Sequence, residues 1–530
     1  MNFPFSSDVL DFGTRDPRRM RQFSRGFWLF CLLLTGVVIY VSKSTSLSDY
    51  IGALILILAC LTPAYLWTRQ VALGLPFFPL LTLSHIMFYA IPLISAHPGT
   101  HYYSESERLG AALWLAFAIL GGMIVWLQFV TKVPTPPKKL MQFQLPGGRQ
   151  FLLDFGVTFL LLGILFVHLI LNHGFLASWR MLLPFGIISL IRMASGAVAF
   201  LCIFLGFYRI GMGRMSLVLR LIFLGAFLGF VVDQVAGLIL MSAALLCIPA
   251  LFGYILAKRR IPFFTLVGVG ALFAYLNISK GEVRYLFWSE RDRSGDRVFI
   301  SDYDELFLEW NRQSWSILTT GEATFYNPDV NSLSVVERAS LMHIYLIPYT
   351  QSPTMVDFMW GGSYKVIPQL LVPRFLNPKK PFAHEGQVQL NIHYGLQDRE
   401  TAQRTFLAWG LVPEAQANFG TSGVVGLFLA LGLGLGWLTR WTMNVPILSY
   451  RSLVAAIFLL TMIDTETVAS LFVTSTFQSL AIVSTFALVF MRSMENPEYR
   501  RLRANLDFRQ DESPQRVEQP NSPAVNHNYN

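Results

Sequence analysis

Charged residues are scarce in this chain of 530 residues. Asp, Glu, Lys and Arg make up 14% of it, and hydrophobic residues make up 53%. Soluble domains contain roughly 25% charged residues, which they need to cover their surface. A soluble enzyme or binding module of this size is therefore excluded, and the composition predicts an integral membrane protein.

Cysteine is nearly absent as well. The chain has four cysteines, Cys31, Cys60, Cys202 and Cys247, which all lie in apolar runs. The long polar segment 278–422 has none. A disulfide framework is therefore not needed. The chain also lacks a spacing of His, Cys, Asp or Glu that is typical of a metal site, so we expect neither a metal nor a cofactor.

Long apolar runs are abundant, and each run of about 20 residues matches a hydrocarbon core about 30 Å thick. We therefore expect an all-α polytopic membrane protein with about 12 transmembrane helices. Nine helices would form a membrane domain at 26–277, and three more would follow at 423–492. The runs lie at 27–41, 51–67, 71–95, 109–130, 151–172, 182–207, 216–232, 235–256, 261–277 and 423–442, and the stretch 452–492 suits two passages.

Basic residues gather in alternate breaks between these runs. If the basic amino terminus, 1–25, is cytoplasmic, every clearly basic break falls on the cytoplasmic side, as the positive-inside rule requires. Both termini are then cytoplasmic, and the segment 278–422 is extracytoplasmic. The net charge of +9 reflects this sorting and does not indicate nucleic-acid binding. The tail, 493–530, is polar without an apolar period and is predicted to be disordered.

The segment 278–422 is one large outer loop between helices nine and ten. From Ala339 to Leu371 it is apolar and aromatic but broken by prolines and glycines, which predicts short helices at the membrane interface. Next come four cationic or protonatable residues among three prolines, which forbid a regular helix there. These residues, Arg374, Lys379, Lys380 and His384 among Pro373, Pro378 and Pro381, would lie near the lipid head groups, within reach of a lipid-linked phosphate.

Some polar residues inside or beside the apolar runs are also candidates. Arg192 lies within the run 182–207, where a cation costs several kcal/mol unless it is paired or faces a polar cavity. Asp233 is equally well explained as the cap of a hairpin or as part of a site. Asp464 and Glu466 would be buried partners of basic residues or part of a turn. The GLGLG sequence at 432–436 lies inside a run, so it indicates close helix packing and not a phosphate loop.

A resemblance to a known family rests on two short elements. A Pro-Arg and Asn-Pro-Lys-Lys-Pro element at 373–381 precedes Glu414, Asn418, Gly420 and Gly423, just before the next apolar run. With the large late outer loop, this resembles the Wzy-type polymerases of oligosaccharide repeat units, or O-antigen polymerases. The resemblance implies a GT-C-like membrane glycosyltransferase of the cytoplasmic (inner) membrane that acts on repeat units carried by undecaprenyl diphosphate. A flippase and a chain-length regulator would be its partners.

Glycosyl transfer from a lipid diphosphate assigns roles to these residues. Negative charge grows on the leaving diphosphate, and we expect Arg374 and Lys380 to stabilise it. Glu414 is the candidate general base, although it could instead favour a helix N-terminus or pair with Arg374 or Arg404. The expected substrate-binding residues are Arg192, Lys379, His384, Arg404 and Asn418.

Three alternative functions remain open from the sequence. An O-antigen ligase would use the same donor and cations with a different acceptor. A flippase for lipid-linked oligosaccharides should have cations deep inside several spans, whereas only Arg192 lies deep here. A scaffold of an export machine would use the outer loop as an interaction surface.

Overall fold

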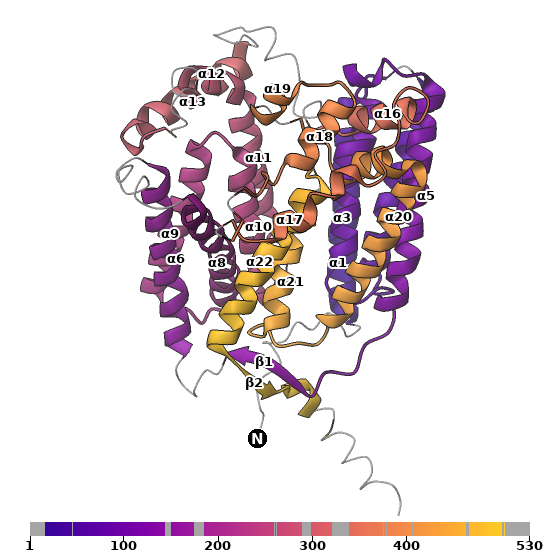
Figure 1. The fold of residues 1–530 in the computed structure, drawn as a ribbon. Helices are drawn as coiled ribbons and strands as arrows, with labels where there is room; N and C mark the ends of the chain where they lie inside the picture. Colours follow the sequence, from indigo (N-terminus) through magenta and orange to yellow (C-terminus); the bar gives the residue numbers. More distant parts are fainter. Residues whose placement is uncertain are drawn as a thin grey trace, which may run out of the picture.

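The computed structural model describes residues 16–44, 46–143, 150–173, 185–258, 260, 262–288, 298–320, 339–374, 376, 377, 379–404, 407–462, 466–500 and 503. Helices dominate this part of the chain, which confirms the expected all-α class (Figure 1). Two short strands, β1 (Lys139–Phe143) and β2 (Met491–Glu495), are the exception.

Ten of the described helices are long and apolar enough to cross a membrane, so the chain is a multi-pass membrane protein. In the third of these spans, α3 continues through a π-helical turn at Ile86–Ala90 into α4. The spans are α1 (Pro17–Val41), α2 (Leu47–Thr68), α3 to α4 (Phe77–Ile94), α5 (Glu105–Val130), α6 (Gln150–Asn172), α8 (Phe185–Gly211), α9 (Leu217–Ala236), α10 (Leu240–Lys258), α20 (Leu411–Trp441) and α22 (Ala469–Phe490).

Two of the expected spans differ from straight, full-length helices. The first is a pair, α11 (Phe263–Ile278) and α12 (Lys280–Trp288), bent by 54° at Ser279. The second, α21 (Tyr450–Thr461), is a shorter apolar helix. The described chain therefore has 10 or 11 candidate spans, not about twelve. Polar residues explain the difference: charged residues begin at Lys280, and the polar stretch that ends at Glu466 follows α21.

The long polar segment folds into short helices at one end of the bundle. Helices α12, α13 (Tyr303–Thr320), α16 (Met342–Gln351), α18 (Glu385–His393) and α19 (Arg399–Arg404) lie there, opposite to β1 and β2 (Figure 1). Because α20 already begins at Leu411, this segment ends before residue 422, where we expected its boundary. The described residues of the segment also form the short helix α17 (Ile367–Leu371).

At the other end, β1 and β2 pair antiparallel, with Lys139 opposite Glu495 and Phe143 opposite Met491. The pairing ties the connection between α5 and α6 to the end of α22. Residues 493–495, which we expected in a disordered tail, therefore form part of a strand. Residues 504–530 of that tail lie outside the described residues.

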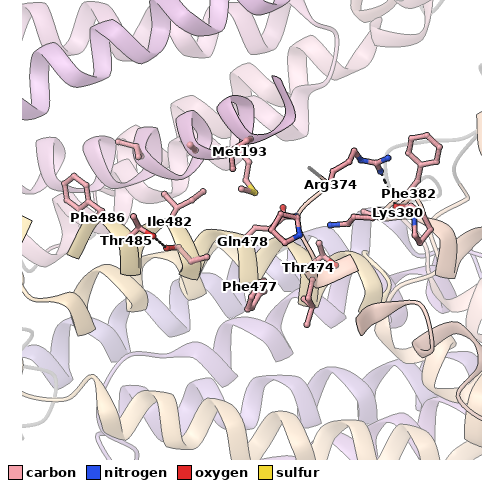
Figure 2. A pocket seen from close by; sticks show the side chains of 18 of the residues that line it. Met193, Arg374, Lys380, Phe382, Thr474, Phe477, Gln478, Ile482, Thr485 and Phe486 are labelled. Atoms are coloured by element: carbon pink, nitrogen blue, oxygen red, sulfur yellow. Dashed lines mark hydrogen bonds between the residues drawn. The ribbon is translucent and has the colours of Figure 1, made fainter. Parts of the chain in front are cut away.

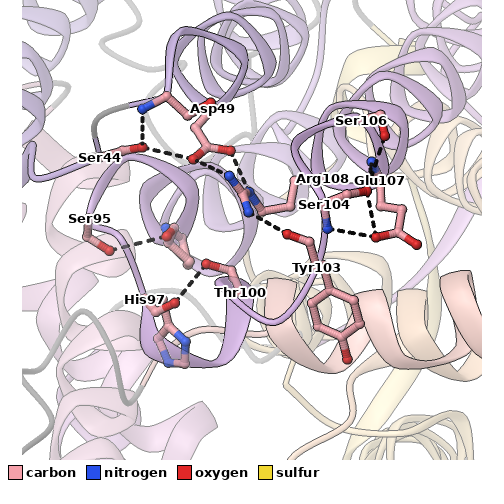
Figure 3. Close-up of polar contacts among 12 residues, drawn as sticks. Ser44, Asp49, Ser95, His97, Thr100, Tyr103, Ser104, Ser106, Glu107 and Arg108 are labelled. Atoms are coloured by element: carbon pink, nitrogen blue, oxygen red, sulfur yellow. Dashed lines mark hydrogen bonds and ion pairs between the residues drawn. The ribbon is translucent and has the colours of Figure 1, made fainter.

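Two buried ion pairs fasten the helices at opposite ends of the bundle. Arg108 at the start of α5 donates to Asp49 of α2 over 2.7 and 3.0 Å (Figure 3). Arg209 near the end of α8 donates to Asp154 of α6 over 2.6 and 3.0 Å. Removing one partner from either pair would leave an uncompensated buried charge and would cost about 3–5 kcal/mol.

Glycines allow α5 and α20 to approach closely. A Cβ at Gly432 would lie 2.2 Å from the carbonyl oxygen of Gly122, and one at Gly122 would lie 2.4 Å from that of Phe428. Gly436 faces Phe129 of α5 in the same way, whereas a Cβ at Gly434 would meet nothing within 4 Å. The prediction that GLGLG marks close helix packing is confirmed.

Candidate functional site

Helices α8 and α22 and residues 371–384 enclose a cavity of about 830 Å³. Arg374, Lys380 and His384 line it at the end formed by the loop. Apolar side chains of α8 and α22 form most of the remaining wall, as far as Phe486 and Phe490. Figure 2 shows Arg374 and Lys380 at one end of this cavity and Phe486 at the other. The cavity is thus cationic at one end and mostly apolar along its length, apart from Thr474, Gln478 and Thr485 of α22.

Local contacts hold Arg374 and Lys380 at the loop end of this cavity, which we call its mouth. Helix α17 ends at Leu371, and the Lys380 ammonium donates to the carbonyl oxygens of Leu370 and of Val372, the latter at 2.9 Å. The Arg374 guanidinium donates to the Pro381 carbonyl at 3.3 Å and lies 5.4 Å from the ring centroid of Phe382. The loop is therefore held in shape by its own backbone, as its prolines predict.

The mouth of the cavity carries positive charge. Among the described residues that line the cavity, none is Asp or Glu. Partial burial, together with the charge of Arg374, lowers the pKa of the Lys380 ammonium. Glu385, next to the site in sequence, pairs with Arg399 at 3.0 Å. Two cations that repel each other favour a bound anion between them, because the anion removes the repulsion.

His384 lies on the same wall, with its ring stacked on Phe382 at a centroid distance of 5.6 Å. Partial burial lowers the pKa of His384 below its ordinary value, and the charge of Glu385 offsets part of this effect. The imidazole is therefore largely unprotonated at neutral pH and can accept a proton.

Glu414 lies behind this wall, in the first turn of α20, and its side chain is fully buried. One carboxylate oxygen accepts from the Ser363 hydroxyl at 2.7 Å. The other accepts from the backbone N–H of Ala469, the first residue of α22, at 2.5 Å. Asn418 donates to the same Ser363 hydroxyl at 2.8 Å. Glu414 is not among the residues that line the cavity.

A break in α20 completes this buried network. Gly420 has φ 65° and ψ −156° inside the helix, a conformation that other residues rarely adopt. The break leaves the carbonyl oxygens of Ala417 and Asn418 to accept from the N–H groups of Met359 and Trp360 at 3.0 and 3.1 Å. Asn418 and Gly420, both noted in the sequence, therefore join α20 to the loop that carries Ser363. Sequence reasoning missed Ser363, whose only signal was the preceding glycine pair.

The other predicted site residues lie elsewhere. Arg192 lines a different cavity, between α6, α8, α9 and α10. Lys379 is exposed and is not among the residues that line the large cavity. Pro378, Asp464 and the side chain of Arg404 lie outside the described part of the structure. The structure thus brings Arg374, Lys380 and His384 to one cavity and places Arg192 at another, whereas Lys379 points away from the cavity that its neighbour Lys380 lines.

Asp233, whose role the sequence left open, proves to be a buried acceptor. Its carboxylate accepts from His168 at 2.7 Å, from His173 at 2.5 Å and from the Tyr303 hydroxyl at 3.0 Å. Tyr303 comes from α13 of the polar segment, so the pairing was not visible in the sequence.

Comparisons of this chain with protein-family models, with curated proteins and with solved structures find no match.

Proposed function

We propose that this protein is a membrane-embedded glycosyltransferase that polymerises oligosaccharide repeat units carried on a polyprenyl diphosphate such as undecaprenyl diphosphate. The observation that supports this most directly is the large cavity, with cations at its mouth and apolar walls behind them. A ligand that fits this cavity would have an anionic head group for the cations and a long hydrocarbon tail for the apolar walls. A polyprenyl diphosphate has both.

The length of the apolar wall suits such a tail. From Thr474 to Phe490, α22 rises by roughly 24 Å at 1.5 Å per residue, which is most of a hydrocarbon core about 30 Å thick. A prenyl chain lying along α22 and α8 would stay within the bilayer. The diphosphate would then reach the loop at the extracytoplasmic end.

The two cations suit the leaving group of the reaction. The acceptor hydroxyl oxygen forms a bond to the anomeric carbon of the donor sugar, and the bond from that carbon to the diphosphate oxygen breaks. The diphosphate leaves with the bonding electrons, so negative charge grows on it. Arg374 offers a planar fork to phosphate oxygens and Lys380 a compact charge, both already held in place.

The proton of the attacking hydroxyl needs an acceptor on the cavity wall. His384 lines the cavity and is largely unprotonated at neutral pH, so we assign it this role. Glu414 is fully buried, and both of its oxygens accept hydrogen bonds. These contacts favour a structural role over that of general base: Glu414 holds the start of α22 against α20, a contact that the sequence did not predict.

Purified protein in liposomes, supplied with one lipid-linked repeat unit, tests the proposal. Wild-type protein should form polymer and release polyprenyl diphosphate. Arg374→Ala and Lys380→Ala should leave single units on the lipid, and Arg374→Lys should also be poor because the fork is lost. Lys365→Ala is a matched control, since Lys365 is an exposed lysine of the same segment outside the cavity.

Because Lys380 also bonds two backbone carbonyls, thermal unfolding of each variant must match wild type before loss of polymer is attributed to chemistry. Polymer of normal length from both alanine variants would refute the proposal. Product that forms only when a second, different acceptor is added would identify a ligase instead.

A further inference from the structure

A second cavity, of about 330 Å³, lies between α6, α8, α9 and α10. Six polar side chains line it: His168, Asn172, Arg192, Ser195, Gln234 and Ser242. Phe200 and Phe230 and several aliphatic residues form the rest of the wall. A lipid chain lying against this wall would remove water from these polar groups and offer them no hydrogen bond in return, which is costly. The lining therefore indicates a ligand with many hydrogen-bonding groups and an apolar face.

Asp233 fixes the orientation of His168 on this wall. Its carboxylate accepts from the His168 ring at 2.7 Å and is itself buried, with His173 and Tyr303 on its other oxygen. Gln234 is also buried, and its amide lies 2.9 Å from His168. These contacts connect α6, α9 and α13, so the polar groups are held in place before a ligand binds.

The charge at this cavity differs from that at the large one. Arg192 is the cation among the described lining residues, and its guanidinium lies 3.4 Å from the side-chain oxygen of Asn172. The carboxylate of Asp233 lies directly behind His168 and offsets the positive charge. A diphosphate gains nothing from such a balanced site. An uncharged ligand rich in hydroxyl groups fits it better.

We propose that this cavity binds a single neutral sugar residue. Its volume is near the lower end of the range of about 300–1,000 Å³ for small-molecule sites, so it suits one ring and not a chain. Amides, hydroxyls and a guanidinium match sugar hydroxyls, and the phenyl rings match the apolar face of the sugar. Assigning this sugar to a repeat unit rests on the proposed function, whereas the sugar site itself does not.

Helix α8 connects the two cavities. Met193 and Ala194 line the large cavity, whereas Arg192, Ser195 and Gly196 line the small one. One helix thus forms a wall of both the proposed lipid diphosphate site and the sugar site.

Gly196 offers a specific way to block the small cavity. It lines the cavity, and a Cβ there would meet nothing within 4 Å, so Gly196→Leu fills the space without a backbone clash. Gly225→Leu is the matched control, because Gly225 of α9 is exposed, also has no atom within 4 Å of a built Cβ, and lies outside the cavity. A second blocking variant, Gln234→Leu, removes a buried amide from the wall.

The test is saturation-transfer NMR on the protein in nanodiscs with glucose, galactose, mannose, N-acetylglucosamine and glucuronate, each added separately. At least one neutral sugar should give a signal with wild type, with Gly225→Leu and with Arg374→Ala, and should lose it with Gly196→Leu and Gln234→Leu. Thermal unfolding confirms that each variant is folded. A signal that persists in both folded blocking variants, binding of glucuronate alone, or no signal from any sugar would overturn the sugar site.

The same experiment separates this inference from the proposed function. Sugar binding that persists in Arg374→Ala, together with normal polymer from Arg374→Ala in liposomes, would leave the sugar site standing and refute the polymerase mechanism. Polymer that depends on Arg374, with no sugar bound in the small cavity, would support the polymerase mechanism and overturn the sugar site.

Discussion

Glu414 can be tested by a substitution that keeps its size. In Glu414→Gln, the amide oxygen can still accept from Ala469, and the amide nitrogen can donate to the Ser363 hydroxyl. We therefore expect polymer of near-normal length from Gln. We expect a destabilised protein with little polymer from Glu414→Ala, because Ala leaves a buried N–H unpaired at a cost of about 1–3 kcal/mol.

The measurements for Glu414 are polymer length and the midpoint of thermal unfolding. A Gln variant that unfolds like wild type but makes no polymer would show that the carboxylate accepts the proton, and would restore Glu414 as the general base.

His384 should determine how the reaction rate falls at acidic pH. The reactive form is the unprotonated imidazole, so the rate should fall as the pH falls through the pKa of His384. Since partial burial lowers this pKa below its ordinary value of about 6.5, activity should persist into mildly acidic solution. His384→Asn should lower turnover by about 10²–10⁴-fold and abolish this acidic limb, as measured by initial rates against pH.

His393→Asn is the matched control for His384. His393 lies at the end of α18, bonds the Asp357 carbonyl at 2.8 Å and is not among the residues that line the cavity. An unchanged acidic limb in His384→Asn would assign the proton acceptor to another group.

At the scale of elements, the contact between α5 and α20 depends on individual glycines. Gly432→Ala should destabilise the protein by about 1–3 kcal/mol, because its Cβ would overlap the Gly122 backbone and force the helices apart. Gly434→Ala, two residues away on the open side of the same helix, should be neutral or slightly stabilising, since Ala favours helix more than Gly does.

Thermal unfolding in detergent compares the two glycine variants directly. Equal stability of Gly432→Ala and Gly434→Ala would show that the glycine contact does not determine the distance between α5 and α20.

At the scale of the whole molecule, the sidedness of the membrane can be predicted. Lys139 lies in β1, which pairs with β2 near the carboxyl-terminal tail, so both must lie on one side. Helix α13, which contains Asp304, lies at the opposite end (Figure 1). Reporter fusions at Lys139, at Lys258 and in the tail should be cytoplasmic, whereas a fusion near Asp304 should be extracytoplasmic. A cytoplasmic signal at Asp304 would also overturn the proposed site, because the lipid-linked substrate is expected on the outer face.

The sequence by itself determined the membrane class, the approximate positions of the helices and the cationic loop. Hydropathy, charge and proline content depend only on residues that are close together in the sequence, so they can be read directly from it. Arg374, Lys380 and His384 could be grouped because they are close in sequence, and the glycines of α20 because they lie inside an apolar run.

Only the tertiary structure decided which helices meet. The cavity wall of α8 and α22, the bonds from Glu414 to Ser363 and Ala469, the pairing of β1 with β2 and the contact of Tyr303 with Asp233 all join distant parts of the chain. Apolar helices of similar composition can pack in many arrangements, and the choice among them depends on side-chain shape and on a few buried polar contacts. That is why the cations were predictable, whereas the apolar wall behind them and the sugar-sized cavity beyond it were not.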